Sequence, residues 1–222
     1  MNDPWILYLH GFTSGPQSRK AQALQARMQQ RGIGDRFVCP QLPASPKEAI
    51  SLAESLLATP VGAGVECRFS TTDPLRRHEA VLRETPASPL SNFVTIVGSS
   101  LGGYYATSLA EKHDLKAVLV NPAVASAISL EQYLGPQRWL YSGEEFELTR
   151  QHLAEMNALY LPSLEFPERF WLLVEEGDET LDYRQAVARY AGAKQTVLPG
   201  GDHSFTRWDD YLDDIILFAG LV

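Results

Sequence analysis

The chain has 222 residues, of which 45% are hydrophobic and 21% are charged, and its formal net charge is −8. This length allows one domain with a sizeable core, so we treat residues 1–222 as a single domain of ordinary globular composition. The 19 basic and 27 acidic side chains form no basic stripe, which argues against nucleic acid as a partner.

The N-terminal region and the two cysteines carry no targeting or metal-binding signal. Residues 1–4 have no basic cluster and the apolar run at 5–9 is short, so we expect no signal peptide. No segment approaches the ~20 apolar residues that a membrane-spanning helix needs, and we expect a cytoplasmic protein. Cys39 and Cys67 lack metal-ligand spacing, and a disulfide between them is left open. The sequence therefore calls for no metal and no organic cofactor.

Short apolar runs alternate with helix-period stretches, which favours a parallel sheet covered on both faces. The pattern predicts strands at residues 5–9, 36–39, 93–97, 117–120, 170–174 and 195–198. It predicts helices at residues 18–31, 46–58, 101–112, 183–191 and 208–218. Right-handed crossovers bring the strand-to-helix loops to one edge of such a sheet, where ligands bind. We therefore predict a compact α/β fold with a mostly parallel sheet of about six strands and helices on both faces.

Two segments interrupt this alternation. Residues 59–91 are rich in glycine and proline around a charged middle, and they are long for a connection between elements. They form either an irregular excursion or a small extra element. Residues 122–168 are rich in aromatic residues and follow a central strand. Their composition fits a lid over a site and fits extra packing on the flank of the sheet, so both interpretations stay open.

The most informative motif is a G-x-S-x-G turn between a predicted strand and a predicted helix. A β-branched stretch leads into Gly98-Ser99-Ser100-Leu101-Gly102. In a nucleophile elbow, glycines at these places remove side chains that would collide, and the serine hydroxyl projects above the sheet. Only Ser100 has glycine on both sides at the required spacing, so Ser100 is the candidate nucleophile. Ser99 is then a packing or hydrogen-bonding neighbour.

The first predicted strand ends in His10-Gly11-Phe12. Acyl transfer places negative charge on a carbonyl oxygen, so the site needs donors that already point at it. The backbone N–H groups of Phe12 and Leu101 are the expected oxyanion-hole pair, and Gly11 lets the loop approach the substrate. We expect His10 to brace this loop by hydrogen bonding rather than to act as the base.

The candidate base follows the last predicted strand. His203 lies in the run Gly200-Gly201-Asp202-His203, on a loop that two glycines make adaptable. His78 falls in the irregular segment, whereas His113 and His152 look like solvated helix positions.

The candidate acid follows the strand predicted at 170–174. Asp178 comes directly after Gly177, and an acid at this place can orient the imidazole and stabilise its cation. Glu179 and Asp182 compete with it, but Asp182 is better placed to cap the next helix. The chain order of serine, then acid, then histidine matches that of α/β-hydrolase triads.

Together these motifs resemble the YqiA-like small bacterial esterases of the α/β-hydrolase superfamily. The resemblance covers most of the chain and rests on YLHGF at 8–12, SRKA at 18–21, CPQLP at 39–43, VGSSLGGYYA at 97–106, NPA at 121–123, GDE at 177–179, LDYRQA at 181–186 and GGDHSF at 200–205. It implies a small-molecule hydrolase that cleaves carboxylic esters or thioesters, acyl-CoA-type substrates included. The same resemblance implies that Ser100, Asp178 and His203 are the catalytic triad and that the reaction passes through an acyl-enzyme. The segment 59–91 looks longer than its family counterpart, which leaves the acyl-chain preference open.

Other functions remain to be weighed against this one. An acyltransferase has the same signature but passes the acyl group to a second alcohol instead of water. A non-catalytic binding module with the hydrolase fold is a further alternative, although the complete set of triad residue types argues against it. A peptidase is least favoured because nothing suggests an acidic cluster for an amine. The sequence does not determine the oligomeric state.

Overall fold

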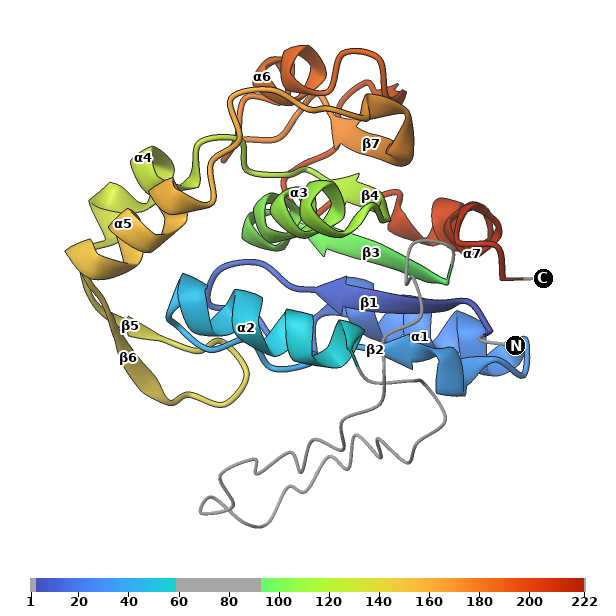
Figure 1. Ribbon diagram of the computed structural model, residues 1–222, viewed down its shortest axis with the longest axis horizontal. Coiled ribbons are helices and arrows are strands. Elements are labelled where there is room, and N and C mark those ends of the chain that lie inside the picture. Colours follow the sequence, from blue (N-terminus) through green and yellow to red (C-terminus); the bar gives the residue numbers. More distant parts are fainter. Residues whose placement is uncertain (1–2, 59–92, 222) are drawn as a thin grey trace.

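The computed structural model describes residues 3–58 and 93–221 (Figure 1). Its main sheet has six strands in the order β2-β1-β3-β4-β7-β8, and all its pairings are parallel. The strands are β1 (Trp5–Leu9), β2 (Phe37–Val38), β3 (Val94–Ser99), β4 (Lys116–Val120), β7 (Phe170–Glu175) and β8 (Lys194–Leu198). This confirms the predicted α/β class and the parallel sheet. The predicted irregular segment 59–91 lies outside the described residues.

Helices cover both faces of this sheet, as predicted (Figure 1). The helices α1 (Arg19–Gln30) and α7 (Leu212–Phe218) pack on one face. The other face carries α2 (Pro46–Leu57), α3 (Leu101–His113) and α6 (Tyr183–Arg189). The helix predicted at 208–218 begins as the 3-10 turn η5 (Trp208–Tyr211) and becomes α-helical in α7.

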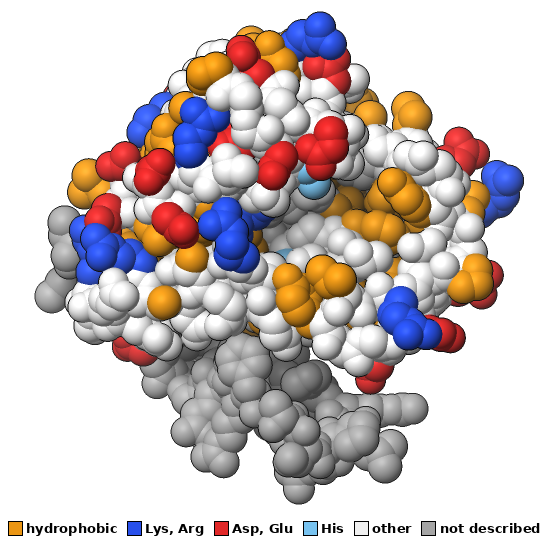
Figure 2. Space-filling model, turned by 180° about the vertical axis from the view of Figure 1, so that it is seen from behind, with side chains coloured by type: hydrophobic (Ala, Val, Ile, Leu, Met, Phe, Trp, Pro, Cys, Tyr) orange, Lys and Arg blue, Asp and Glu red, His pale blue; other side chains and the backbone are white. Residues whose placement is uncertain are grey.

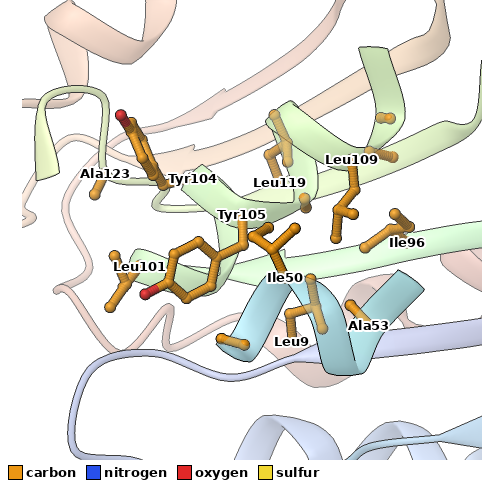
Figure 3. Packing of buried hydrophobic residues seen from close by; sticks show 14 of the residues in the cluster. Leu9, Ile50, Ala53, Ile96, Leu101, Tyr104, Tyr105, Leu109, Leu119 and Ala123 are labelled. Carbon is orange, nitrogen blue, oxygen red and sulfur yellow. The ribbon is translucent and has the colours of Figure 1, made fainter. Parts of the chain in front are cut away.

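The strand β1 shows how one short sequence serves two hydrophobic cores. Side chains alternate across a strand, so Trp5, Leu7 and Leu9 enter the core under α2 and α3. Ile6 and Tyr8 enter the core under α1 and α7. Figure 3 shows the first of these cores, in which sheet side chains face those of α2 and α3. Burying each large apolar side chain contributes about 1.5–3 kcal/mol, so both faces of the sheet are firmly fixed.

The aromatic segment 122–168 forms a small substructure of its own. It contains α4 (Ser126–Leu130), the 3-10 turn η3 (Glu131–Tyr133), the antiparallel hairpin β5 (Gly135–Arg138) and β6 (Glu145–Leu148), and α5 (Arg150–Ala158). The sequence pattern did not predict these elements. In Figure 1 they lie beyond the carboxyl ends of β1 and β3, apart from the main sheet. They therefore border the edge at which a ligand site was expected.

Candidate active site

Ser100 lies in the sharp turn between β3 and α3. Its backbone has φ 55° and ψ −120°, a conformation that residues with a side chain rarely adopt. Two backbone hydrogen bonds hold the turn: Ser100 N–H donates to the Val120 carbonyl at 3.0 Å, and Ala123 N–H donates to the Ser100 carbonyl at 3.0 Å. The strained residue is thus tied to the end of β4.

The glycines around Ser100 are required by close backbone packing. A β-carbon on Gly98 would lie 2.4 Å from the Gly102 carbonyl oxygen. A β-carbon on Gly102 would lie 2.0 Å from the Leu9 carbonyl oxygen. Neither neighbour can move cheaply because both contacts are with backbone. The G-x-S-x-G pattern therefore lets α3 begin directly against β1 and β3.

The structure brings the three candidate catalytic side chains together. Ser100 Oγ lies 3.1 Å from His203 Nε2. His203 Nδ1 lies 2.9 Å from Asp178 Oδ1 and 2.8 Å from Asp178 Oδ2. The Asp178 side chain is almost fully buried, whereas that of His203 is 24% exposed. The imidazole thus bridges a buried carboxylate and the serine hydroxyl.

The three candidates for the acid of the triad, Asp178, Glu179 and Asp182, have three different partners. Asp178 faces the imidazole, and its Oδ1 also accepts hydrogen bonds from the N–H groups of Thr180 and Leu181 at 2.9 and 2.8 Å. Glu179 Oε2 accepts instead from the backbone N–H of His203 at 3.0 Å. Asp182 caps α6 by accepting from the Arg184 N–H, as predicted. Among these three, only Asp178 can orient the imidazole.

Glu175, at the end of β7, anchors the loop that carries His203. Its side chain is fully buried and accepts hydrogen bonds from the backbone N–H groups of Asp202, Thr206 and Arg207, and from the Arg207 guanidinium. Burial alone would raise the pKa of Glu175, but these donors outweigh it and lower the pKa to about 2. No motif in the sequence marks Glu175 for this role.

Asn121 is a second anchor that the sequence analysis missed. This buried residue follows β4 with φ 40°. Its Oδ1 accepts from the Glu175 N–H at 3.0 Å, and its Nδ2 donates to the carbonyls of Asp202 and His203 at 3.0 and 3.2 Å. Asn121 therefore joins the ends of β4 and β7 to the histidine loop. Its place between a central strand and Pro122 was the available signal.

The predicted oxyanion loop lies beside Ser100, the candidate nucleophile. A β-carbon on Gly11 would stand 3.2 Å from Ser100 Cβ, so the loop passes as close as its glycine allows. His10 braces the loop, as expected: its Nδ1 donates to the Gly11 carbonyl at 2.9 Å and its Nε2 accepts from the Leu42 N–H at 3.0 Å. Burial lowers the pKa of His10 to about 4, although the bond to Gly11 opposes this shift. The ring is therefore neutral at pH 7 and occupied on both nitrogens.

The β5–β6 hairpin packs on the candidate oxyanion loop. The Leu140 N–H donates to the Thr13 carbonyl at 2.8 Å. The Trp139 ring meets His10 edge-on with centroids 6.3 Å apart, and Phe146 meets Phe12 edge-on at 6.0 Å. The segment 122–168 thus contacts the candidate oxyanion loop directly. Its function as a lid stays a prediction.

A cavity of about 890 Å³ opens above these groups. Ser100, His203, Phe12 and Leu101 line it together with residues of α1 and of the segment 122–168. Figure 2 shows this hollow, with hydrophobic side chains gathered along one side and charged ones on the other. Its size is that of a small-molecule site.

His113 and His152 are partly exposed positions of α3 and α5, and each also has a structural partner, whereas His78 lies outside the described residues. His113 Nε2 lies 2.9 Å from Glu54 Oε1. His152 completes the capping box of α5 with Thr149. Across residues 3–58 and 93–221, no three His, Cys, Asp or Glu side chains cluster as metal ligands would. Nor does any helix in those ranges have the length and apolar character to cross a membrane.

Comparison with solved structures defines the class of the fold. A putative hydrolase from Agrobacterium vitis S4 matches with TM-score 0.63 and 17% identity, over 98% of this chain and 88% of that one. Est1E from Butyrivibrio proteoclasticus with ferulic acid bound matches with TM-score 0.57 and 12% identity, over 96% and 88%. The Paleococcus ferrophilus monoacylglycerol lipase matches with TM-score 0.58 and 13% identity, over 100% and 97%. The chain has the α/β-hydrolase fold.

A family model identifies the chain more narrowly. The model described as uncharacterised protein family UPF0227 matches residues 5–64 and 72–220. The chain therefore belongs to UPF0227, which agrees with the resemblance to YqiA-like proteins drawn from its motifs.

Proposed function

We propose that this protein is a serine hydrolase that cleaves carboxylic esters or thioesters through an acyl-enzyme. The observation that supports this most is the continuous hydrogen-bonded chain from Ser100 Oγ through His203 to the buried Asp178. A serine hydroxyl is a weak nucleophile until a base takes its proton, and this arrangement supplies the base and its orienting acid.

The first step forms the acyl-enzyme. His203 Nε2 takes the Ser100 proton while Oγ forms a bond to the carbonyl carbon of the substrate. The carbonyl oxygen becomes negative and accepts hydrogen bonds from the backbone N–H groups of Phe12 and Leu101. Within the described part of the chain, neither of these N–H groups has an acceptor. The bond to the leaving group then breaks, and the leaving oxygen or sulfur receives the proton from His203.

The second step releases the acid. A water molecule loses its proton to His203 and attacks the acyl carbon, and Ser100 then recovers a proton as the ester bond to its Oγ breaks. Asp178 stabilises the imidazolium cation that forms in both steps. Ferulic acid, the molecule bound to Est1E, is a carboxylic acid, which is the product type that such a reaction releases.

The test compares two adjacent serines. Ser100→Ala should reduce kcat for p-nitrophenyl butyrate at least about 10³-fold while leaving the fold intact, because it removes the nucleophile. Ser99→Ala is the matched control: this neighbour is buried and interacts with Tyr8, so its loss should change kcat far less. A fluorophosphonate should label Ser99→Ala but not Ser100→Ala, as read by intact mass. Near-normal turnover by Ser100→Ala would refute the proposal.

Product analysis separates hydrolysis from acyl transfer. In water with added butanol, a hydrolase releases mainly the free acid, whereas an acyltransferase forms mainly the butyl ester. A dominant butyl ester at low alcohol concentration would replace the proposed hydrolase with the acyltransferase.

A further inference from the structure

We propose that Lys20 and Arg19 form a subsite for an anionic group, so that the site prefers esters whose alcohol portion carries a carboxylate. The inference rests on the proposed ester hydrolysis and names its substrate class. Lys20 and Arg19 line a side of the cavity that has no role in the proposed mechanism.

Lys20 borders the cavity that also exposes Ser100 and His203. Its Nζ donates one hydrogen bond, to the carbonyl of Ser204 at 2.8 Å, and Ser204 directly follows the candidate base. An ammonium group has three donors, so two of them remain for a ligand. In the residues that the structure describes, no carboxylate forms an ion pair with Lys20.

Within the described ranges, the charge on Lys20 has no carboxylate in direct contact, but three lie near enough to act on it. Burial and the neighbouring Arg19 guanidinium lower the pKa of Lys20 to about 8, and the carboxylates of Asp202, Asp178 and Glu175 oppose this shift. Arg19 itself reaches the Phe205 carbonyl at 2.9 Å and the exposed Asp209 carboxylate at 3.3 Å. A carboxylate placed between these two cations would relieve their repulsion and gain charge-assisted hydrogen bonds.

The Lys, Arg, Asp and Glu side chains that line the cavity sum to a positive charge. Glu179 is the one carboxylate among the lining residues of the described chain, and its Oε2 already accepts from the His203 N–H. The lining therefore carries two cations and one anion, and Arg19 is itself paired with Asp209.

The mechanism decides which half of the substrate meets Lys20. The leaving oxygen must accept its proton from His203, so the alcohol portion lies beside the histidine loop, to which Lys20 is bonded. The acyl portion then lies toward the opposite wall, where Phe12 packs against Tyr133 and Leu130 also lines the cavity. In Figure 2 hydrophobic side chains gather on one side of the hollow, and the other side carries both acidic and basic side chains.

The experiment uses two esters of nearly equal shape, 4-acetoxybenzoate and 4-acetoxybenzamide. Each kcat/KM is divided by the rate constant of hydroxide hydrolysis, which removes the difference in leaving-group reactivity. We expect the wild-type protein to favour the carboxylate at least about tenfold, the effect of one charge-assisted contact. Equal corrected values for the two esters would overturn the inference.

Variants assign the preference to Lys20. Lys20→Met should lower the carboxylate-to-amide ratio toward one, Lys20→Arg should keep it, and Lys47→Met, an exposed residue outside the cavity, should leave it unchanged. A loss that affects both esters equally would show that Lys20 only supports the loop, and would also overturn the inference. The ratio of the wild-type protein decides the matter even if Lys20→Met does not fold.

Binding measurements keep this inference separate from the proposed function. Calorimetric titration of the wild-type protein with 4-hydroxybenzoate and 4-hydroxybenzamide needs no turnover. Tighter binding of the carboxylate without hydrolysis of either ester would support the subsite and refute the hydrolase. Hydrolysis of both esters with equal binding of both products would support the hydrolase and refute the subsite.

Discussion

The Glu175 carboxylate occupies the space that a side chain at Gly201 would fill, at the base of the loop that carries His203. A β-carbon on Gly201 would stand 1.9 Å from Glu175 Oε2, and the φ of Gly201 is 76°. The carboxylate can reach the three backbone N–H groups of the loop because residue 201 has no side chain. The position of His203 thus depends on a glycine two residues before it.

The first prediction separates two causes of lost stability at Gly201: the clash of a new side chain with the Glu175 carboxylate, and backbone strain at positive φ. Gly201→Ala should destabilise the fold by at least about 2 kcal/mol more than Gly200→Ala, because it displaces a buried, hydrogen-bonded carboxylate. Gly200 has a similar φ of 68° but nothing within 4 Å of its would-be β-carbon, so it reports strain alone. Urea unfolding measures both variants. Equal losses of unfolding free energy would contradict this reading.

The second prediction concerns Asp178, the acid proposed to orient His203. Asp178→Asn should lower kcat by about 10³–10⁴-fold because the amide favours the wrong imidazole tautomer. Glu179→Gln and Asp182→Asn are matched controls, since they bond to the His203 N–H and to the α6 N-terminus instead. Their effects should stay below about tenfold. A larger loss from Glu179→Gln than from Asp178→Asn would reassign the acid.

The third prediction tests Asn121 as a positioning residue. Asn121→Asp removes the Nδ2 donor and turns a carboxylate oxygen toward the carbonyls of Asp202 and His203. Repulsion should move the loop and lower kcat about 10–100-fold with little change in KM, because the substrate pocket itself is kept. Steady-state kinetics as a function of pH measures this. A change confined to KM, or an unaltered pH profile with full kcat, would exclude the positioning role.

The fourth prediction follows from the neutral, buried His10. Its folded pKa of about 4 lies below the ordinary histidine value of 6.5, so below pH 6.5 the unfolded chain binds a proton that the folded chain does not bind. The unfolding free energy should therefore fall as the pH drops from 6.5 toward 4, by up to about 1.4 kcal/mol per pH unit. His10→Gln should flatten this slope. Urea titrations between pH 6.5 and 5 test it, since the lowered carboxyl pKa values act only below about 4.5.

Much of the fold could be predicted from the sequence because parallel strands are buried on both faces and are therefore apolar along their length. β3, β4 and β7 are nearly continuous apolar runs, so their places along the chain could be predicted. The β5–β6 hairpin was not, because its strands GPQR and EFEL have few apolar residues. It is held instead by contacts such as Phe146 with Phe12, which depend on the tertiary structure.

The same distinction applies to the candidate site. Ser100, Asp178 and His203 were predictable because each follows a strand in a recognisable glycine-containing turn. Glu175 and Asn121 were missed because their significance lies in backbone groups that reach them from a distant loop. A single acid or amide at a strand end does not reveal such partners in the sequence.

The order of the strands in the sheet also bears on how the protein is made. Ser100 is held by β3 and β4, while His203 follows β8, the last strand of the main sheet along the chain. A nascent polypeptide that has emerged only as far as α6 contains Ser100 and Asp178 but lacks His203. The proposed triad is therefore complete only after β8 and the loop that carries His203 have been synthesised.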